Sequence, residues 1–420
     1  MIGVSPRLIF LALFIAGLAY LLYRDRDKIQ RSSILFYRRT KNGINRIKAI
    51  QSRFPRFWKA YGWAAAISGV LSMILAALYI GGKFVDVFST GSVKKAGLSF
   101  VAPGLVSHSS FQPGISFIPV EYWLIGVGIV MTVHELSHGI VALSENFEIN
   151  SVGWIVLGIF PGAFVEPKGE RMLPAGEGEE EEFHHEEDGE SSGMWDQGKL
   201  SSRIKVLGAG SFANYLTALI MILLSGFVLS MVAHPGQIYY TTVPNQSASG
   251  AGMTNGTLNS INGNRIDNVS ELQKTTAGLK PGDNIVLNTS EGVFNVKAGK
   301  RTYQPTIGIP GIFTVPKGPE KTEGYIGMQF YQSSVINQGL KPYQAGLSWF
   351  ISLLQTIAIL NLGIGLINML PLKPLDGGQI MGGVIENYLG ESASKAFNYF
   401  SGLGMLALIG VILLSVATAL

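Results

Sequence analysis

The chain has 420 residues, of which 47% are hydrophobic and 14% charged, with a formal net charge of +4 and a mean hydropathy of +0.30. Soluble domains carry roughly 25% charged residues, so this composition, combined with long apolar segments, excludes an ordinary soluble enzyme. The absence of cysteine excludes disulfides, iron–sulfur clusters and zinc sites built on thiolates.

Six apolar segments are long enough to cross a bilayer, which predicts an α-helical polytopic membrane protein with about six transmembrane helices. They lie at residues 8–23, 60–81, 120–143, 204–232, 345–370 and 401–420. A cleaved signal peptide is the alternative for the first segment. We favour a membrane anchor, because charged residues follow Tyr23 where a cleavage site requires small ones.

The segment from Arg24 to Lys59 is strongly basic, because its 12 Lys and Arg residues against 2 Asp residues give a local charge of +10. Basic loops stay on the cytoplasmic side, so the N-terminus and residues 234–344 are expected outside the cell membrane. All four Asn-x-Ser/Thr sequons lie within 234–344, which supports this orientation. They are at Asn245, Asn255, Asn268 and Asn288.

Apolar residues recur every three or four positions inside the basic segment, at Ile44, Ile47, Ile50, Phe54 and Phe57. Basic residues flank this stripe, which predicts an amphipathic helix lying in the anionic inner leaflet. Nucleic-acid binding is the alternative. The neighbouring membrane spans disfavour it, so we expect the lipid bilayer as partner and no nucleic acid.

Residues 147–167 are rich in β-branched and aromatic residues and are interrupted by Gly and Pro. This pattern predicts a β-hairpin that is too short and too rich in glycine to span the membrane. Irregular backbone at membrane depth must pack against protein or line a wet cavity, so we expect a re-entrant hairpin.

The next segment, residues 177–190, contains nine acids and no base, which predicts a solvated insertion. Within it, His184 and His185 form either a weak metal site or part of a polar tail.

Residues 234–344 combine short β-like runs with Asn-Gly and Pro-Gly-Asp turns. Residues 249–272 resemble the middle of a PDZ domain, and Lys280–Asp283 with the following Asn-Ile-Val-Leu resemble its later strands. We expect an inserted extracytoplasmic PDZ-like domain with β and α elements. The expected parts are an anchor and basic segment at 1–59, a second helix and outer loop at 60–119, two parts of a catalytic membrane core at 120–233 and 345–420, and the PDZ-like domain at 234–344.

The strongest chemical signal is the sequence His134-Glu135-Leu136-Ser137-His138 inside an apolar helix. A spacing of four places both imidazoles on one helical face, as two ligands of one Zn²⁺ require. Glu135 lies beside them, where it can take a proton from a water molecule activated by the metal. Ordinary buried histidines are the alternative, but an intramembrane Glu without a basic partner is costly.

Zinc needs a third protein ligand, and the candidates are carboxylates and the four other histidines, at 108, 184, 185 and 234. Asp376 is the best candidate, because the apolar segment before it should be broken by Pro371 and Pro374. His134 and Asp376 would then both approach the cytoplasmic half of the membrane. A turn at Asp-Gly-Gly is the alternative, and it leaves a carboxylate without a partner.

His-Glu-x-x-His in one span, followed two spans later by Asn-x-x-Pro-x-x-x-x-Asp-Gly at 368–377, resembles the site-2 protease family of intramembrane zinc metalloproteases. Gly210-Ser-Phe-Ala-Asn214 is similar to that family's Gly-x-x-x-Asn, and Phe-Val-Glu-Pro at 164–167 is most similar to archaeal members. The resemblance implies one zinc per chain, and it implies roles for six residues. These are His134, His138 and Asp376 as ligands, Glu135 as catalytic base, and Asn368 and Asn214 as substrate-binding groups.

The implied activity is hydrolysis of peptide bonds in transmembrane protein substrates, as in regulated intramembrane proteolysis. A peptide ligand of the PDZ-like domain is a further expected partner. A catalytically inactive membrane chaperone or receptor of the same fold is one alternative, which the intact set of site residues disfavours. A zinc transporter is another, disfavoured because the ionisable groups gather on two segments and form no pathway.

Overall fold

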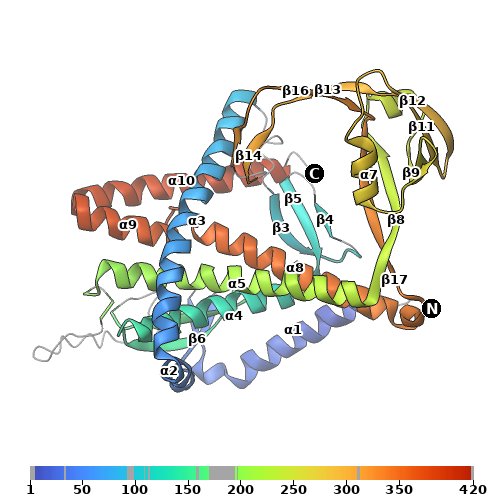
Figure 1. Cartoon of the computed structure of the whole chain (residues 1–420). Coiled ribbons are helices and arrows are strands. Elements are labelled where there is room, and N and C mark those ends of the chain that lie inside the picture. The colour runs from blue at the N-terminus through green and yellow to red at the C-terminus, as the bar shows by residue number, and fades with distance from the viewer. Residues whose placement is uncertain are drawn as a thin grey trace, which may run out of the picture. The chain divides into compact units, whose positions relative to one another are not determined.

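A computed structural model of the chain describes residues 5–32, 35–91, 99–107, 109–111, 114–157, 160–169, 194–195, 197–309 and 313–417. The chain divides into two compact units, of which the first holds residues 1–224 and 352–420 and the second holds 225–351. The acidic segment 177–190, with His184 and His185, and His108 lie outside the described residues. Figure 1 identifies the elements.

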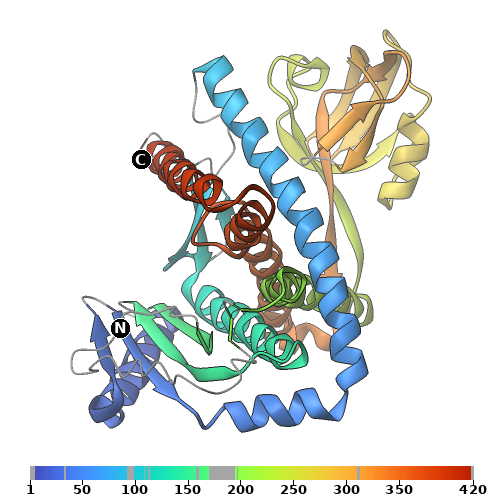
Figure 2. The ribbon, with the colours of Figure 1, turned by 90° about the vertical axis from the view of Figure 1, so that its left-hand side faces the viewer.

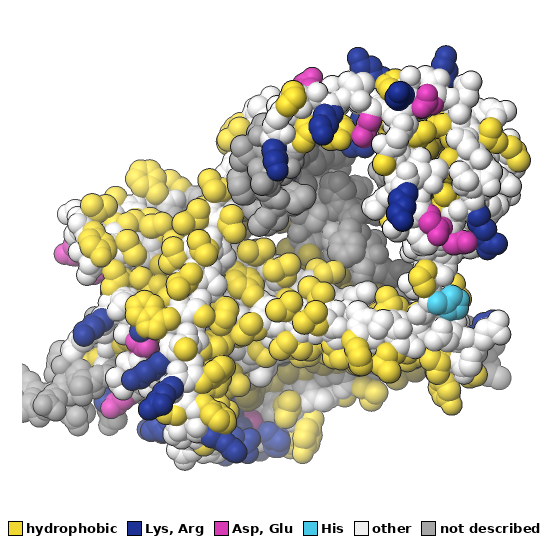
Figure 3. All heavy atoms as spheres, viewed as in Figure 1, with side chains coloured by type: hydrophobic (Ala, Val, Ile, Leu, Met, Phe, Trp, Pro, Cys, Tyr) yellow, Lys and Arg dark blue, Asp and Glu magenta, His cyan; other side chains and the backbone are white. Residues whose placement is uncertain are grey.

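Six helices among the described residues are long and apolar enough to cross a membrane, which confirms the expected number of spans. They include α1 (Pro6–Arg24), α3 (Pro55–Thr90), α4 (Val120–Ser144), α5 (Leu200–Val232), α8 (Gln344–Asn368) and α10 (Glu391–Ala417). On the face in view, Figure 3 shows apolar side chains spread over the helical part of the chain. The second span is longer than the expected 60–81, because Pro55 opens α3 at its first turn and Gly91 closes it in a left-handed cap.

The amphipathic stripe of the basic segment is divided between two helices. Helix α2 (Ile44–Arg53) ends before Pro55, and Figure 2 shows it lying crosswise to α3. Ile44 and Ile47 are buried, and Ile47 packs against Ile140 and Val165. This corrects the expectation that the whole stripe faces lipid, because two of its residues belong to the protein core.

The expected hairpin at 147–167 is present as strands β6 (Ile149–Leu157) and β7 (Phe160–Pro167). It extends into a sheet of order β1-β2-β6-β7, with β1 (Gln30–Ser32) and β2 (Leu35–Thr40) supplied by the basic segment. Arg39 on β2 forms an ion pair of 3.2 Å with buried Glu166 on β7, which also accepts a hydrogen bond from Ser151. Strands β1 and β2 were not predicted from the sequence.

A second sheet that was not predicted precedes helix α4. Strand β5 (Gly114–Pro119) runs parallel to β3 (Ser99–Gly104) and antiparallel to β4 (Ser110–Phe111). At Gly114, which has a positive φ, an added Cβ would lie 2.2 Å from the carbonyl oxygen of Ser415 on α10. The sheet therefore packs closely against the last membrane helix and leads directly into α4.

The second unit contains an antiparallel sheet of order β12-β11-β9-β8-β17, with β10 paired to β9. Its apolar core is formed by these strands and the short helices α6 and α7. The strand bounds are β8 (Ala233–Thr242), β9 (Asn255–Ile261), β10 (Asn264–Arg265), β11 (Asn284–Thr289), β12 (Gly292–Lys297) and β17 (Met328–Ile336). The remaining elements are α6 (Ser247–Gly250), α7 (Val269–Thr276), β13 (Gly299–Tyr303), β14 (Thr306–Ile309), β15 (Phe313–Pro316) and β16 (Lys321–Tyr325).

In the first unit, helices α3, α4 and α5 and the short helix α9 (Asp376–Leu389) share one apolar core. Small residues permit this close packing, since a Cβ on Gly208 of α5 would lie 2.4 Å from the carbonyl oxygen of Ala65 on α3. At the end of α4, Glu145 pairs with Lys205 of α5 at 3.0 Å, and both side chains are about one-tenth exposed. This packing holds the helices that carry the candidate site.

Candidate metal centre

The two histidines of the His-Glu-x-x-His motif lie on one face of α4, as their spacing predicted. Their rings are 4.6 Å apart, and the two Nε2 atoms are 3.0 Å apart. Both side chains are largely buried, with 5% exposure for His134 and 14% for His138. The pair is therefore presented to a site between helices and not to lipid or bulk water.

Asp376 joins this pair from a distant part of the chain. Helix α8 ends at Asn368, the chain turns through the proline segment, and Asp376 is the first residue of α9. Its Oδ2 atom lies 3.2 Å from His134 Nε2 and 3.5 Å from His138 Nε2. Burial alone raises the pKa of Asp376, but the two imidazoles beside it bring the pKa below its ordinary value.

These three groups fit a zinc ion by distance and by donor chemistry. A tetrahedral ion with bonds of about 2.0–2.1 Å to nitrogen and oxygen places its ligand atoms about 3.3 Å apart, and the three separations here are 3.0, 3.2 and 3.5 Å. Asp376 Oδ2 is buried and receives no hydrogen bond from the part of the chain that the structure describes. Three electron-rich atoms converge at this point. A cation bound between them would satisfy the buried carboxylate oxygen, which has no hydrogen-bond donor among the described residues.

The outer nitrogens of both rings have partners that orient them. His138 Nδ1 lies 2.7 Å from the carbonyl oxygen of Val206, so it donates a hydrogen bond and leaves Nε2 free to bind a metal. His134 Nδ1 lies 3.1 Å from the amide of Asn214, whose Oδ1 has no partner. Asn214 thus lies behind the ring of His134, on the side away from Asp376.

Asn368 and Asn214 occupy different positions around His134. Asn368 Nδ2 lies 3.1 Å from Nε2, the nitrogen that faces Asp376. Asn368 also lines the cavity of the candidate centre, whereas Asn214 is fully buried and is not among its lining residues. Asn368 therefore borders the cavity, and Asn214 does not.

Glu135 lines the same cavity and touches the hairpin. Its Oε2 accepts a hydrogen bond of 3.1 Å from the backbone N–H of Val165 on β7. The cavity has a volume of about 160 Å³ and is also lined by Pro167 of β7. The sheet edge, the carboxylate and the metal-binding group therefore border one small space.

Gly210 lies against both histidines, which the sequence pattern did not predict. A Cβ at this position would lie 2.5 Å from Nε2 of both His134 and His138. Glycine leaves room there for the convergence of the two nitrogens. His234, one of the alternative ligands considered from sequence, lies in the second unit and contacts Asn337.

Comparisons with known proteins agree with this geometry. A candidate zinc metalloprotease of Clostridium perfringens is 26% identical over 337 residues, covering 70% of this chain and 96% of the relative. The zinc metalloprotease RasP of Geobacillus kaustophilus is 26% identical over 242 residues, covering 50% of this chain and 57% of the relative. Residues 122–412 match the peptidase family M50, and with this match the chain belongs to that family of membrane zinc metalloproteases.

Proposed function

We propose that this chain is an intramembrane zinc endopeptidase of the site-2 protease type that cleaves transmembrane protein substrates. The observation that carries the proposal is the convergence of His134, His138 and Asp376 beside Glu135 on a membrane helix. Family membership supports a metalloprotease, and the position of His134, Glu135 and His138 on membrane helix α4 supports cleavage within the membrane. Regulated intramembrane proteolysis is the process in which we expect it to act.

Each residue of the centre has a distinct part in this proposal. His134, His138 and Asp376 would hold the metal, which would supply a polarising charge and lower the pKa of a water molecule to about 7. Glu135 accepts the proton of the attacking water and delivers it to the leaving amine. Asn368 donates hydrogen bonds from its Nδ2 to the substrate carbonyl or to the charge that develops on its oxygen.

Strand β7 supports an extended substrate geometry. It is at the edge of the sheet β1-β2-β6-β7, and Val165 and Pro167 on this strand line the cavity of the centre. A helical substrate hides its amides in internal hydrogen bonds, so it must unwind locally before cleavage. The outer edge of β7 can then pair with the unwound stretch by strand addition, with the Val165 N–H released from Glu135.

We further propose that the N-terminus and residues 234–344 are extracytoplasmic and that the second unit is a PDZ-like peptide-binding domain. The ion pair of 3.1 Å between Arg7 and Glu121 supports placing the N-terminus and residues 234–344 on one side of the membrane, because α1 and α4 then begin on the same side and α5 returns to it. The charge of the basic segment supports the extracytoplasmic side. Protease added to right-side-out vesicles should cleave within 234–344 and spare 170–195. Cleavage of 170–195 alone would contradict the orientation.

The proposed chemistry is tested by Glu135→Gln measured for both zinc and cleavage. We expect about one zinc per chain to remain and single-turnover cleavage of a transmembrane reporter to fall by at least about 10²–10⁴, the usual effect of removing a general base. Glu135 lies about 100° around the helix from His134, too far to join the ligand face. Full cleavage with full zinc would place the base elsewhere, and loss of both would make Glu135 structural.

A further inference from the structure

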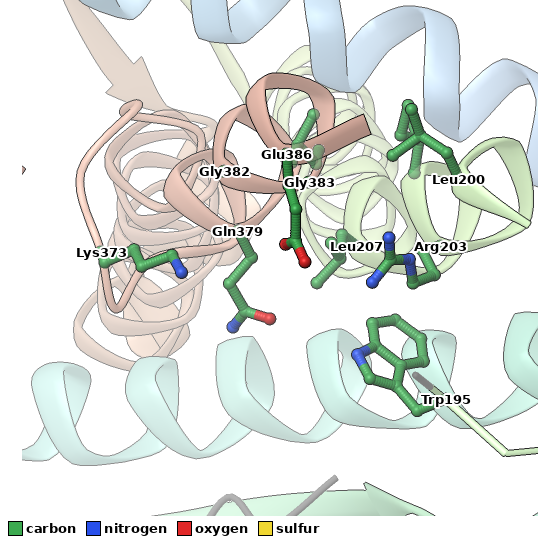
Figure 4. Close-up of a pocket in the computed structure, with 11 residues that line it drawn as sticks. Trp195, Leu200, Arg203, Leu207, Lys373, Gln379, Gly382, Gly383 and Glu386 are labelled. Carbon is green, nitrogen blue, oxygen red and sulfur yellow. The ribbon is translucent and has the colours of Figure 1, made fainter. Parts of the chain in front are cut away.

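A second cavity, called here the charged chamber, adjoins the candidate metal centre in the same unit. Its volume is about 200 Å³. Figure 4 shows Arg203 of α5, Lys373 of the loop before α9, and Gln379 and Glu386 of α9 around one common space. This volume is below the roughly 300–1,000 Å³ of a small-molecule site, so it suits a single side chain.

The charged chamber and the cavity of the metal centre share part of their walls. Trp195, Leu207 and Gln379 line both spaces. Gln379 follows Asp376 by three residues on α9, so both side chains lie on one side of that helix. Successive residues of an extended chain advance by about 3.3 Å, so a residue close to a bond held at the metal can place its side chain here.

Two cations border the charged chamber without a carboxylate partner. Arg203 Nε is buried and has no hydrogen-bond partner among the described residues. Glu386, the acid that lines the space, is exposed to solvent, and among the described residues Arg203 and Lys373 form no ion pair. The local charge is therefore +1, from two cations and one hydrated acid.

A glycine on α9 makes room for Lys373, because a Cβ on Gly382 would lie only 3.0 Å from Lys373 Cε. A Cβ on Gly383 would lie 3.8 Å from Arg203 Nη2, an ordinary contact distance, so the guanidinium lies against this part of α9. Among the described residues its buried Nε donor has no acceptor. A buried donor of this kind is unfavourable until an acceptor arrives, and arginine binds carboxylates with two parallel hydrogen bonds.

We propose that the charged chamber is a substrate subsite that accepts the carboxylate of an acidic side chain near the scissile bond. Arg203 is its specificity-determining residue, and Lys373 adds a second positive charge. The inference rests on the proposed proteolytic function and names a substrate feature that this function alone does not require.

The test uses the full chain and a transmembrane reporter with a neutral cleavage region. One Asp, or one Asn of matched shape, is placed at each position within four residues of the scissile bond. We expect one position at which kcat/KM for the Asp reporter exceeds that for the Asn reporter by about 10- to 100-fold, the range of a hydrogen bond to a charged group. Arg203→Gln should reduce this ratio to about one, and Arg203→Glu should create a preference for Lys over Gln at the same position.

A matched control is Lys199→Gln, which removes a positive charge from an exposed residue four positions before Arg203 that does not line the chamber. It should keep the Asp preference, which excludes a general electrostatic effect. If Arg203→Gln does not fold, as judged by its zinc content, Gly383→Leu should lower the ratio by filling the chamber from α9. The proposal is overturned if no position shows a preference for Asp, or if the preference survives both Arg203→Gln and Gly383→Leu. Failure of the wild type to cleave the neutral reporter would instead refute the proposed function.

Discussion

Gly210→Ala offers the sharpest test of the metal-centre geometry, because it adds one methyl group to the convergence point of the ligands. The added Cβ would lie 2.5 Å from Nε2 of His134 and of His138. The two rings must move apart by several tenths of an ångström or more, while zinc requires both nitrogens within about 2.0–2.1 Å. Changes to groups that merely orient ligands cost about 10- to 100-fold in metal affinity, so we expect a loss of at least this size.

The assay compares zinc affinity and thermal unfolding of Gly210→Ala with those of Gly128→Ala. Gly128 lies on α4, and a Cβ there would meet nothing within 4 Å. Replacing a helical glycine by alanine stabilises a helix by about 0.5–1 kcal/mol where space permits. Gly128→Ala should therefore keep its zinc and gain slightly in stability. A Gly210→Ala protein with wild-type zinc affinity would refute the assignment of the two Nε2 atoms as ligands.

Two other predictions concern stability. Lys205→Met leaves Glu145 buried without its cation and should lower the free energy of unfolding by about 3–5 kcal/mol. The control is Lys395→Met, which breaks an exposed pair with Glu391 and should cost no more than about 1 kcal/mol. Equal thermal unfolding of the two variants would contradict this prediction. The hydrogen bond from Thr254 keeps the pKa of Glu291 below its ordinary value. Ionised Glu291 therefore stabilises the second unit above about pH 4.5, and this stabilisation is lost as the pH falls through the lowered pKa of the folded state. Wild-type protein should therefore lose more stability than Glu291→Gln on acidification below that pH, as measured by thermal unfolding of the full chain.

Local periodicity made part of the site predictable. Helical spacing alone places His134 and His138 on one face, and the structure has them there. The proximity of Asp376 rests on a contact across more than 230 residues, which no local pattern encodes. It could be anticipated only because a partnerless carboxylate at an apolar segment requires an explanation, and because the family resemblance supplied one.

The parts that sequence reasoning missed depend on non-local pairing. Strand β2 lies in the basic segment, for which the sequence predicted an amphipathic helix and no strand. Its stability comes from pairing with β6 and from the ion pair of Arg39 with Glu166, neither of which is visible from neighbouring residues. The contact of Gly210 with both histidines is likewise a property of how α5 crosses α4.

Asn214 was expected to bind substrate, and its place in the structure points to a second role, because it is fully buried behind His134. If Nε2 of His134 binds the metal, Nδ1 must carry the hydrogen and donate it, so only the oxygen of Asn214 can accept it. We therefore expect Asn214 to act as a positioning residue whose Oδ1 turns toward the ring when zinc is bound.

This role predicts different results for two substitutions of similar shape. Asn214→Leu removes the acceptor and should weaken zinc binding by about 10- to 100-fold, whereas Asn214→Asp keeps an acceptor and should restore most of that affinity. Zinc affinity decides the matter, because a purely structural role would not be rescued selectively by aspartate in a buried site where an added charge is unfavourable. Normal zinc binding in Asn214→Leu with a raised KM would instead support the substrate-binding role, since only contact with substrate explains that combination.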